Sequence, residues 1–161
     1  MLPGPTTADA SVNTPATFTL MSGSLSISVP TGPVDLGSAA TTASSLSGQL
    51  GTVTVTDGRG LLVATWSATV SSTDFTTGTA TTHETVTKSN IAYSAGAATS
   101  TTGIGVFTPG VLANLSSAGT AGAWTVGVGN NSASWNPTIN VTIPAGSVTG
   151  TYSGTITHSV A

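Results

Sequence analysis

Strict alternation of apolar and hydroxylic residues is the feature that most limits what this chain can fold into. Residues 24–29 read Ser-Leu-Ser-Ile-Ser-Val, residues 52–56 read Thr-Val-Thr-Val-Thr, and residues 138–143 read Thr-Ile-Asn-Val-Thr-Ile. A period of two places one face of a strand in a core and the other in water. The polar partner is most often Thr, which is β-branched and therefore favours a strand while remaining wettable. The pattern predicts half-buried β-strands.

Charged residues are scarce in this chain, and their scarcity excludes several classes of function. Of 161 residues, 33 are Thr and 22 are Ser, whereas only 2 are Lys or Arg and 5 are Asp or Glu. Two cations cannot neutralise a phosphate backbone, so we expect no nucleic-acid partner. The sequence has no run of apolar residues long enough for a membrane span. Cysteine is absent, which excludes disulfides and thiolate metal sites.

Eleven segments are predicted strands, and turn residues separate them. They are residues 16–21, 24–29, 33–36, 51–56, 62–71, 84–87, 90–93, 103–107, 122–128, 137–143 and 150–160. Gly129-Asn130-Asn131 is one of the predicted turns, and residues 39–48 are expected to form a loop or a short turn. Many short strands with evenly spaced turns indicate an all-β fold, an antiparallel β-sandwich or barrel of about nine to eleven short strands.

The first ten residues differ from the rest because they have no periodicity. Ala8-Asp9-Ala10 has the form of a signal-peptidase site, so residues 1–10 are interpreted as a leader or the remnant of an export signal. A plain tail is the alternative. Residues 11–161 are expected to form a single β-sandwich domain.

Several runs from about residue 11 onward resemble one known group of proteins. They are Phe-Thr-Leu at 18–20, Gly-Ser-Leu-Ser-Ile-Ser-Val at 23–29, Val-Thr-Val-Thr-Asp-Gly-Arg-Gly at 53–60, Ala-Thr-Trp-Ser-Ala-Thr-Val at 64–70, Ser-Thr-Asp-Phe at 72–75, Gly-Asn-Asn at 129–131, Trp-Asn-Pro-Thr at 135–138, Val-Thr-Ile-Pro-Ala at 141–145 and residues 150–160. These runs resemble secreted surface proteins of actinobacteria, which are similar to the WxL domain of Gram-positive cell-surface proteins. The two Trp-x-Leu motifs of that domain correspond to Trp66-Ser67-Ala68 and His158-Ser159-Val160.

The resemblance implies a non-enzymatic structural protein that is extracellular and located at the cell surface. WxL domains are associated with non-covalent attachment to the wall, so the implied partner is cell-wall polysaccharide or peptidoglycan. Both tripeptides depart from Trp-x-Leu, the first in its Leu and the second in its Trp and its Leu.

A self-assembling extracellular filament or layer subunit is the alternative function. Sheet edges are normally protected by charge, above all by Lys, and Lys88 is the only Lys in this sequence. The segment 17–20 would then add as a strand to the sheet of a neighbouring copy. In that case the partner is the protein itself.

Four residues are predicted contacts to a ligand or to another copy: Phe18, Leu20, Trp135 and His158. Trp135 lies among Asn and Ser residues and is expected to be the most exposed tryptophan. Trp66 and Trp124 continue apolar alternations and are expected in the core. His158 shares a strand face with Val160, so it is either a neutral histidine bonded to a hydroxyl or carbonyl in the core, or a pH-sensitive contact.

No arrangement of residues predicts catalysis. The acids are Asp9, Asp35, Asp57, Asp74 and Glu84, and their spacing is typical neither of a glycosidase pair nor of a calcium loop. We therefore expect no catalytic residues, no metal and no cofactor. Arg59, beside the predicted Asp57-Gly58 turn, is expected to pair with Asp57 or Asp74.

Overall fold

The alternating segments form strands whose side chains alternate between core and surface. The structure is a computed structural model that describes residue 4 and residues 10–161. In β3 (Val53–Asp57) and β4 (Trp66–Ser72), every second residue is buried, beginning with the first. Thr54 and Thr56 lie on the more exposed face of β3. Burial of one face of each strand is what a sandwich requires.

The described residues form twelve strands and two 3-10 helices, and none of them lies in an α-helix. Besides β3 and β4, the strands are β1 (Leu25–Ser28), β2 (Ser45–Gln49), β5 (Phe75–Thr76), β6 (Thr85–Val86), β7 (Ile91–Ser94), β8 (Ser100–Pro109), β9 (Val111–Leu112), β10 (Gly119–Trp135), β11 (Thr138–Thr142) and β12 (Ile156–Val160). The 3-10 helices are η1 (Thr82–Glu84) and η2 (Lys88–Asn90). The predicted all-β fold is confirmed, and no helix in the described part of the chain could cross a membrane.

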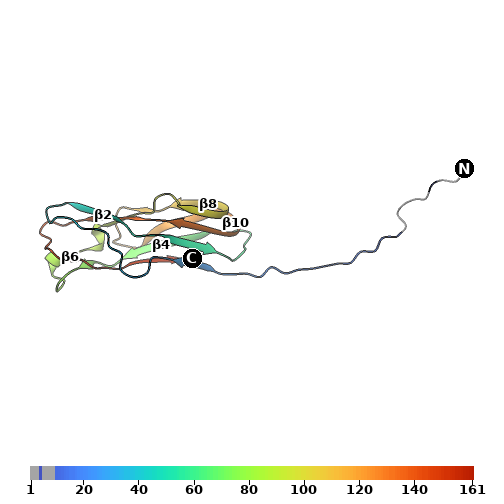
Figure 1. The fold of residues 1–161 in the computed structure, drawn as a ribbon, viewed down its shortest axis with the longest axis horizontal. Coiled ribbons are helices and arrows are strands. Elements are labelled where there is room, and N and C mark those ends of the chain that lie inside the picture. Colours follow the sequence, from blue (N-terminus) through green and yellow to red (C-terminus); the bar gives the residue numbers. More distant parts are fainter. Residues whose placement is uncertain (1–3, 5–9) are drawn as a thin grey trace.

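Two antiparallel sheets make up the sandwich (Figure 1). The first has the order β1-β3-β10-β4-β12, and β8 also pairs with β10. The second has the order β2-β11-β7-β9, and β5 pairs with β6 as a separate ribbon. The edge strands β1 and β12 approach each other, so the first sheet curls into a nearly closed barrel.

β10 is much longer than its predicted segment because it continues through the expected turn at Gly129-Asn130-Asn131. Its first part pairs with β4, its last part pairs with β3, and β8 follows both parts. The register shifts twice between Thr125 and Ser132, and Val126 has a φ of 48°. The bulges bend β10 and turn Val126 to the surface, which reverses the expectation that its alternation continues into the core.

Three further predictions about strands are wrong. Residues 16–21 and 33–36 form no strand, whereas the expected loop at 39–48 contains most of β2. β2 has only one large apolar side chain, Leu46, and it is held in the second sheet by pairing with β11. Pairing with a neighbouring strand, rather than the local sequence pattern, therefore determines whether these segments form strands.

Residues 10–22 run away from the sandwich as an extended N-terminal arm (Figure 1). Phe18, Leu20 and Met21 are 88%, 86% and 91% exposed. The arm has the alternation of a strand, but a strand needs a neighbouring edge, and one copy provides none for it. Most of the expected leader, residues 1–10, lies outside the described residues, and the first backbone hydrogen bond of the sandwich joins Gly23 N to Gly58 O at 2.8 Å.

Candidate functional site

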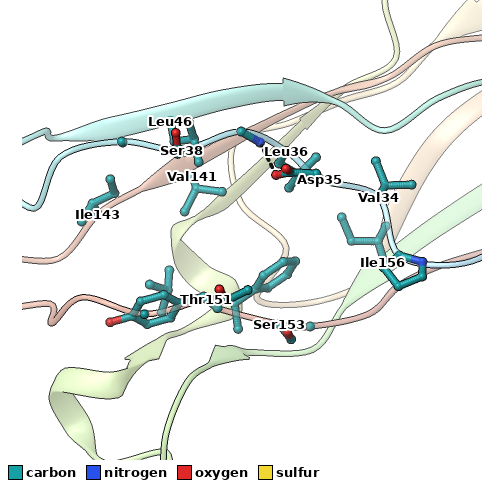
Figure 2. Close-up of a pocket in the computed structure, with 18 of the residues that line it drawn as sticks. Val34, Asp35, Leu36, Ser38, Leu46, Val141, Ile143, Thr151, Ser153 and Ile156 are labelled. Atoms are coloured by element: carbon teal, nitrogen blue, oxygen red, sulfur yellow. Dashed lines mark hydrogen bonds between the residues drawn. The ribbon is translucent and has the colours of Figure 1, made fainter.

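A groove of about 1080 Å³ opens between the two sheets, at the end of the sandwich that carries β6 (Figure 2). Its rims are the β1–β2 connection and the β11–β12 connection, which are two of the places where the chain crosses between sheets. Apolar side chains from both sheets project into it, among them Val34, Leu36, Leu46, Ile143 and Ile156. A groove with this lining suits an apolar or amphipathic occupant.

One rim of the groove offers unpaired backbone. Residues 29–36 belong to no strand, Gly32 forms a bend with a φ of 77°, and within the described part of the chain none of these residues takes part in a backbone–backbone hydrogen bond. Pro30 and Pro33 have no N–H, so the free N–H groups nearest the groove are those of residues 34–36. The segment ends where the Asp35 carboxylate accepts a hydrogen bond from the Gly37 N–H at 2.8 Å. Peptide groups without partners are the groups that an added strand would bind.

Two of the predicted contact residues, Trp135 and His158, are joined through Tyr93. The Trp135 indole Nε1–H donates to the Tyr93 hydroxyl at 2.9 Å, and that hydroxyl lies 2.8 Å from His158 Nε2. Because the Trp135 N–H donates to the Tyr93 oxygen, the Tyr93 O–H can donate to Nε2 in the tautomer of neutral His158 that carries its proton on Nδ1. His158 also lines the groove, so the chain of hydrogen bonds runs from the core to the groove wall.

Burial determines the protonation of the hydrogen-bonded side chains Tyr93 and His158. It lowers the pKa of His158 from 6.5 to about 4 and raises the pKa of Tyr93 to about 12, the latter against a smaller opposing effect of the Trp135 hydrogen bond. The only salt bridge among the described residues is Asp57–Arg59, so no carboxylate there compensates a charge on His158. The hydrogen bond to the Tyr93 hydroxyl agrees with the interpretation of His158 as a histidine bonded to a hydroxyl, and its place in the groove wall leaves the pH-sensitive contact as a prediction.

Trp135 is not the exposed tryptophan that its polar neighbours suggested. It is 0% exposed, and Trp66 and Trp124 are 3% and 1% exposed, as predicted for those two. The Trp66 ring stacks between the other two indoles, with centroids 6.2 Å and 6.3 Å away, and Phe107 closes the cluster. Because all three indoles are buried, they form a core and offer no stacking platform to a sugar.

Phe18 and Leu20 lie far from this chain of hydrogen bonds. The structure places them on the exposed arm, at the end of the sandwich opposite β6 (Figure 1).

Sequence reasoning missed Tyr93 and the groove. Tyr93 does follow the alternation of its strand, since Ile91 and Tyr93 are buried and Ala92 is less so, but its two partners come from other strands.

The two tripeptides compared above with Trp-x-Leu motifs lie on neighbouring strands. Val160 of β12 is paired with Ala68 of β4, and the backbone groups of Ser67 and Ala161 exchange hydrogen bonds at 2.9 Å and 3.1 Å. The Trp66 indole points inward and donates to Asn131 Oδ1 at 2.8 Å. Segments that are distant in the sequence therefore lie side by side in one sheet, with Trp66 and Ala68 on its buried face.

Arg59 pairs with Asp57, one of its two predicted partners. Its Nε and Nη2 atoms donate to the two carboxylate oxygens at 2.9 Å and 2.8 Å, and its own backbone N–H donates to the same group. This guanidinium is the main reason why the pKa of Asp57 is lowered. Arg59 also donates to the Thr65 carbonyl, so the pair fastens the loop that joins β3 to β4.

Comparisons with protein-family models, with curated proteins and with solved structures found no match. Within the described residues, no three His, Cys, Asp or Glu side chains are grouped so that they could hold a metal ion. The groove and the arm are therefore the features from which a function is argued.

Acidification is expected to destabilise the fold through His158. The unfolded chain binds a proton near pH 6.5, whereas the folded chain resists it until about pH 4, so stability is full above pH 6.5 and falls as the pH drops between these values. Because the ring is partly exposed, we expect a loss of about 1–2 kcal/mol rather than the full linkage energy. Urea unfolding at pH 7 and pH 4.5 measures it.

Two substitutions control this experiment. His158→Gln should remove most of the difference between the two pH values, whereas His83→Gln, at an exposed histidine, should leave it unchanged. Equal free energies of unfolding at both pH values in the unsubstituted protein would contradict a half-buried histidine whose pKa is lowered in the folded chain.

Proposed function

We propose that this protein is a non-enzymatic, secreted structural protein of the cell surface that assembles with copies of itself. The observation that carries the proposal is the N-terminal arm, whose large apolar side chains are almost fully exposed in a single copy. Phe18 and Leu20 are more than four-fifths exposed, and single soluble subunits rarely leave such a segment uncovered.

The arm has one apolar face. In an extended chain, residues 12, 14, 16, 18 and 20 share a face, and they are Val, Thr, Ala, Phe and Leu. The opposite face is more polar and holds Ser11, Asn13, Pro15, Thr17, Thr19 and Met21. Full burial of Phe18 and of Leu20 contributes about 1.5–3 kcal/mol each. Such a segment suits addition to the sheet of another molecule.

The arm leaves the sandwich at the end opposite β6 (Figure 1), and the groove is lined by Val86 of β6. β1 connects them, since Leu25 at its start pairs with Asp57 beside the arm, whereas Val29 and Pro30, just after its end, line the groove. A subunit that donates at one end and accepts at the other makes head-to-tail contacts that need not close. This geometry favours a filament or a layer over a closed dimer.

Export and location at the cell surface follow from the resemblance to secreted actinobacterial surface proteins. The composition agrees with this setting, since strands rich in Thr and Ser with almost no charge depend little on pairing by ions. The wall is then the surface on which a filament or layer would be laid down.

Attachment to peptidoglycan is a second candidate function. The observation in its favour is the pairing of the two tripeptides at 66–68 and 158–160, which places them side by side in one sheet. Cosedimentation with purified peptidoglycan, by a protein that does not associate with itself, would favour this candidate over assembly.

The assembly proposal predicts that purified full-length protein forms particles whose mass grows with concentration. Static light scattering measures the mass, and negative-stain microscopy shows whether the particles are linear. Because the interface is apolar and uncharged, raising the salt concentration should not dissolve them. A protein that remains strictly monomeric at high concentration would overturn the proposal.

A further inference from the structure

We infer that the groove between the sheets is the receptor for the N-terminal arm of a second copy of this chain. The inference rests on the proposed self-assembly and adds to it the site at which one copy holds the next. Three properties of the groove select this occupant: its backbone, its lining and its charge.

The backbone of the groove rim is ready to pair with an added strand. Residues 34–36, which follow the bend at Gly32 and Pro33, have no backbone–backbone hydrogen bond within the described chain. β12, on the other side, is bonded through one edge to β4, and its start at Ile156 reaches the groove. An extended arm lying along either rim would satisfy peptide groups that the single copy leaves to water.

The lining accepts side chains from one face of a strand. Val34 and Leu36 project from one rim and Ile156 from the other, while Leu46 and Ile143 come from the second sheet (Figure 2). Phe18 and Leu20 are two residues apart on one face of the arm, so both can enter while Thr17 and Thr19 face outward. Pro15, which lacks an N–H, falls before this segment and removes no hydrogen bond from it.

The scarcity of charged side chains in the groove disfavours a strongly basic or strongly acidic peptide as its occupant. Asp35 and His158 are the only acid and base among the residues that line the groove, and burial keeps His158 neutral at pH 7. A basic or acidic peptide would find almost nothing to pair with there. The arm over residues 10–22 has no ionisable side chain, so its burial in the groove involves no cost of removing a charge from water.

The inference is tested with one substitution in the groove and one in the arm. Val34→Asp places a charge on the groove rim at a side chain that is 38% exposed, so the fold is not expected to suffer. Phe18→Asp places the same charge on the apolar face of the arm. Each is expected to weaken self-association about 100-fold, the loss typical of a central interface residue.

Matched controls carry the same substitution elsewhere. Val111→Asp lies at an exposed valine of β9 outside the groove, and Thr19→Asp lies on the opposite face of the arm. Both should associate within about threefold of the unsubstituted protein, and Val148→Asp, a second groove substitution, should behave as Val34→Asp does. Unfolding curves establish that each variant is folded.

Mixing the two defective variants gives the decisive result. The Val34→Asp protein still has an intact arm, and the Phe18→Asp protein still has an intact groove, so an equimolar mixture should form heterodimers that grow no further. Sedimentation velocity distinguishes monomers, heterodimers and polymers.

Two outcomes overturn the inference and leave the proposed assembly intact: normal polymers from the Val34→Asp protein, or a mixture that stays monomeric although the unsubstituted protein polymerises. If the unsubstituted protein itself does not assemble, the proposed function is wrong, and this result is distinct from the two above.

Discussion

A variant that lacks residues 1–21 is expected to be monomeric under conditions in which the full chain forms polymers. The deletion removes Phe18 and Leu20 but no residue of the buried core, because the first backbone contact of the sandwich is made by Gly23. We therefore expect the free energy of unfolding of the truncated monomer to stay within about 0.5 kcal/mol of the value for an isolated full-length subunit. Light scattering and urea unfolding measure the two quantities.

The missing segment should act in trans. A synthetic peptide of residues 10–22 is expected to bind the truncated protein and to raise its stability by mass action, by about 2.7 kcal/mol when its concentration is 100 times its dissociation constant. The control peptide carries Asp in place of Phe18 and Leu20 and should have no effect. Polymers from the truncated protein as abundant as those from the full chain would show that assembly uses another surface.

The arm also shows where reading strands from the sequence reaches its limit. Residues 16–20 alternate as the residues of β1 do, yet only β1 forms a strand, because β3 offers it an edge. Pattern describes which face of a segment is apolar. Whether a partner edge exists within the same copy is a property of the whole fold, so the pattern of 16–21 is equally compatible with a partner in another copy.

The opposite error occurs where local pattern is weak. The composition of β2, in which Ser, Gly and Gln dominate, predicts a loop, but pairing with β11 over five residues holds it in the second sheet. The Gly129-Asn130-Asn131 segment has the composition of a turn and is instead a bulged part of β10, since β8 follows it through both register shifts. Glycine and asparagine permit the unusual backbone angles of a bulge as readily as those of a turn.

The groove could not be predicted because it is formed by connections. Its rims, at 29–41 and 147–156, cross between sheets and have no periodicity that would bring them together. Trp135 is a different case. In β10 the buried residues after the bulge are Asn131, Ala133 and Trp135, a period-two pattern that outweighs the polar neighbours from which its exposure is predicted.

Replacement of Trp135 by alanine is accordingly expected to lower the free energy of unfolding by about 3–5 kcal/mol, as much as the same change at Trp66 or Trp124. The indole is fully buried, stacks on Trp66 and Phe107, and donates to Tyr93. Urea unfolding of the three variants tests this. A loss below about 1 kcal/mol for Trp135→Ala alone would mean that this side chain is exposed after all.

Trp135→Phe separates packing from hydrogen bonding at this site. The phenyl ring keeps most of the contact with Trp66 and Phe107 but has no N–H for the Tyr93 hydroxyl, so we expect a smaller loss of about 1–3 kcal/mol. The hydrogen bond from Trp135 also opposes the rise in the pKa of Tyr93, and its removal should move that pKa further upward. Ultraviolet titration of the tyrosines detects such a change. An unaltered Tyr93 titration in a folded Trp135→Phe protein would show that the indole only fills space beside Tyr93, and the hydrogen-bonded chain would then reduce to the contact between Tyr93 and His158.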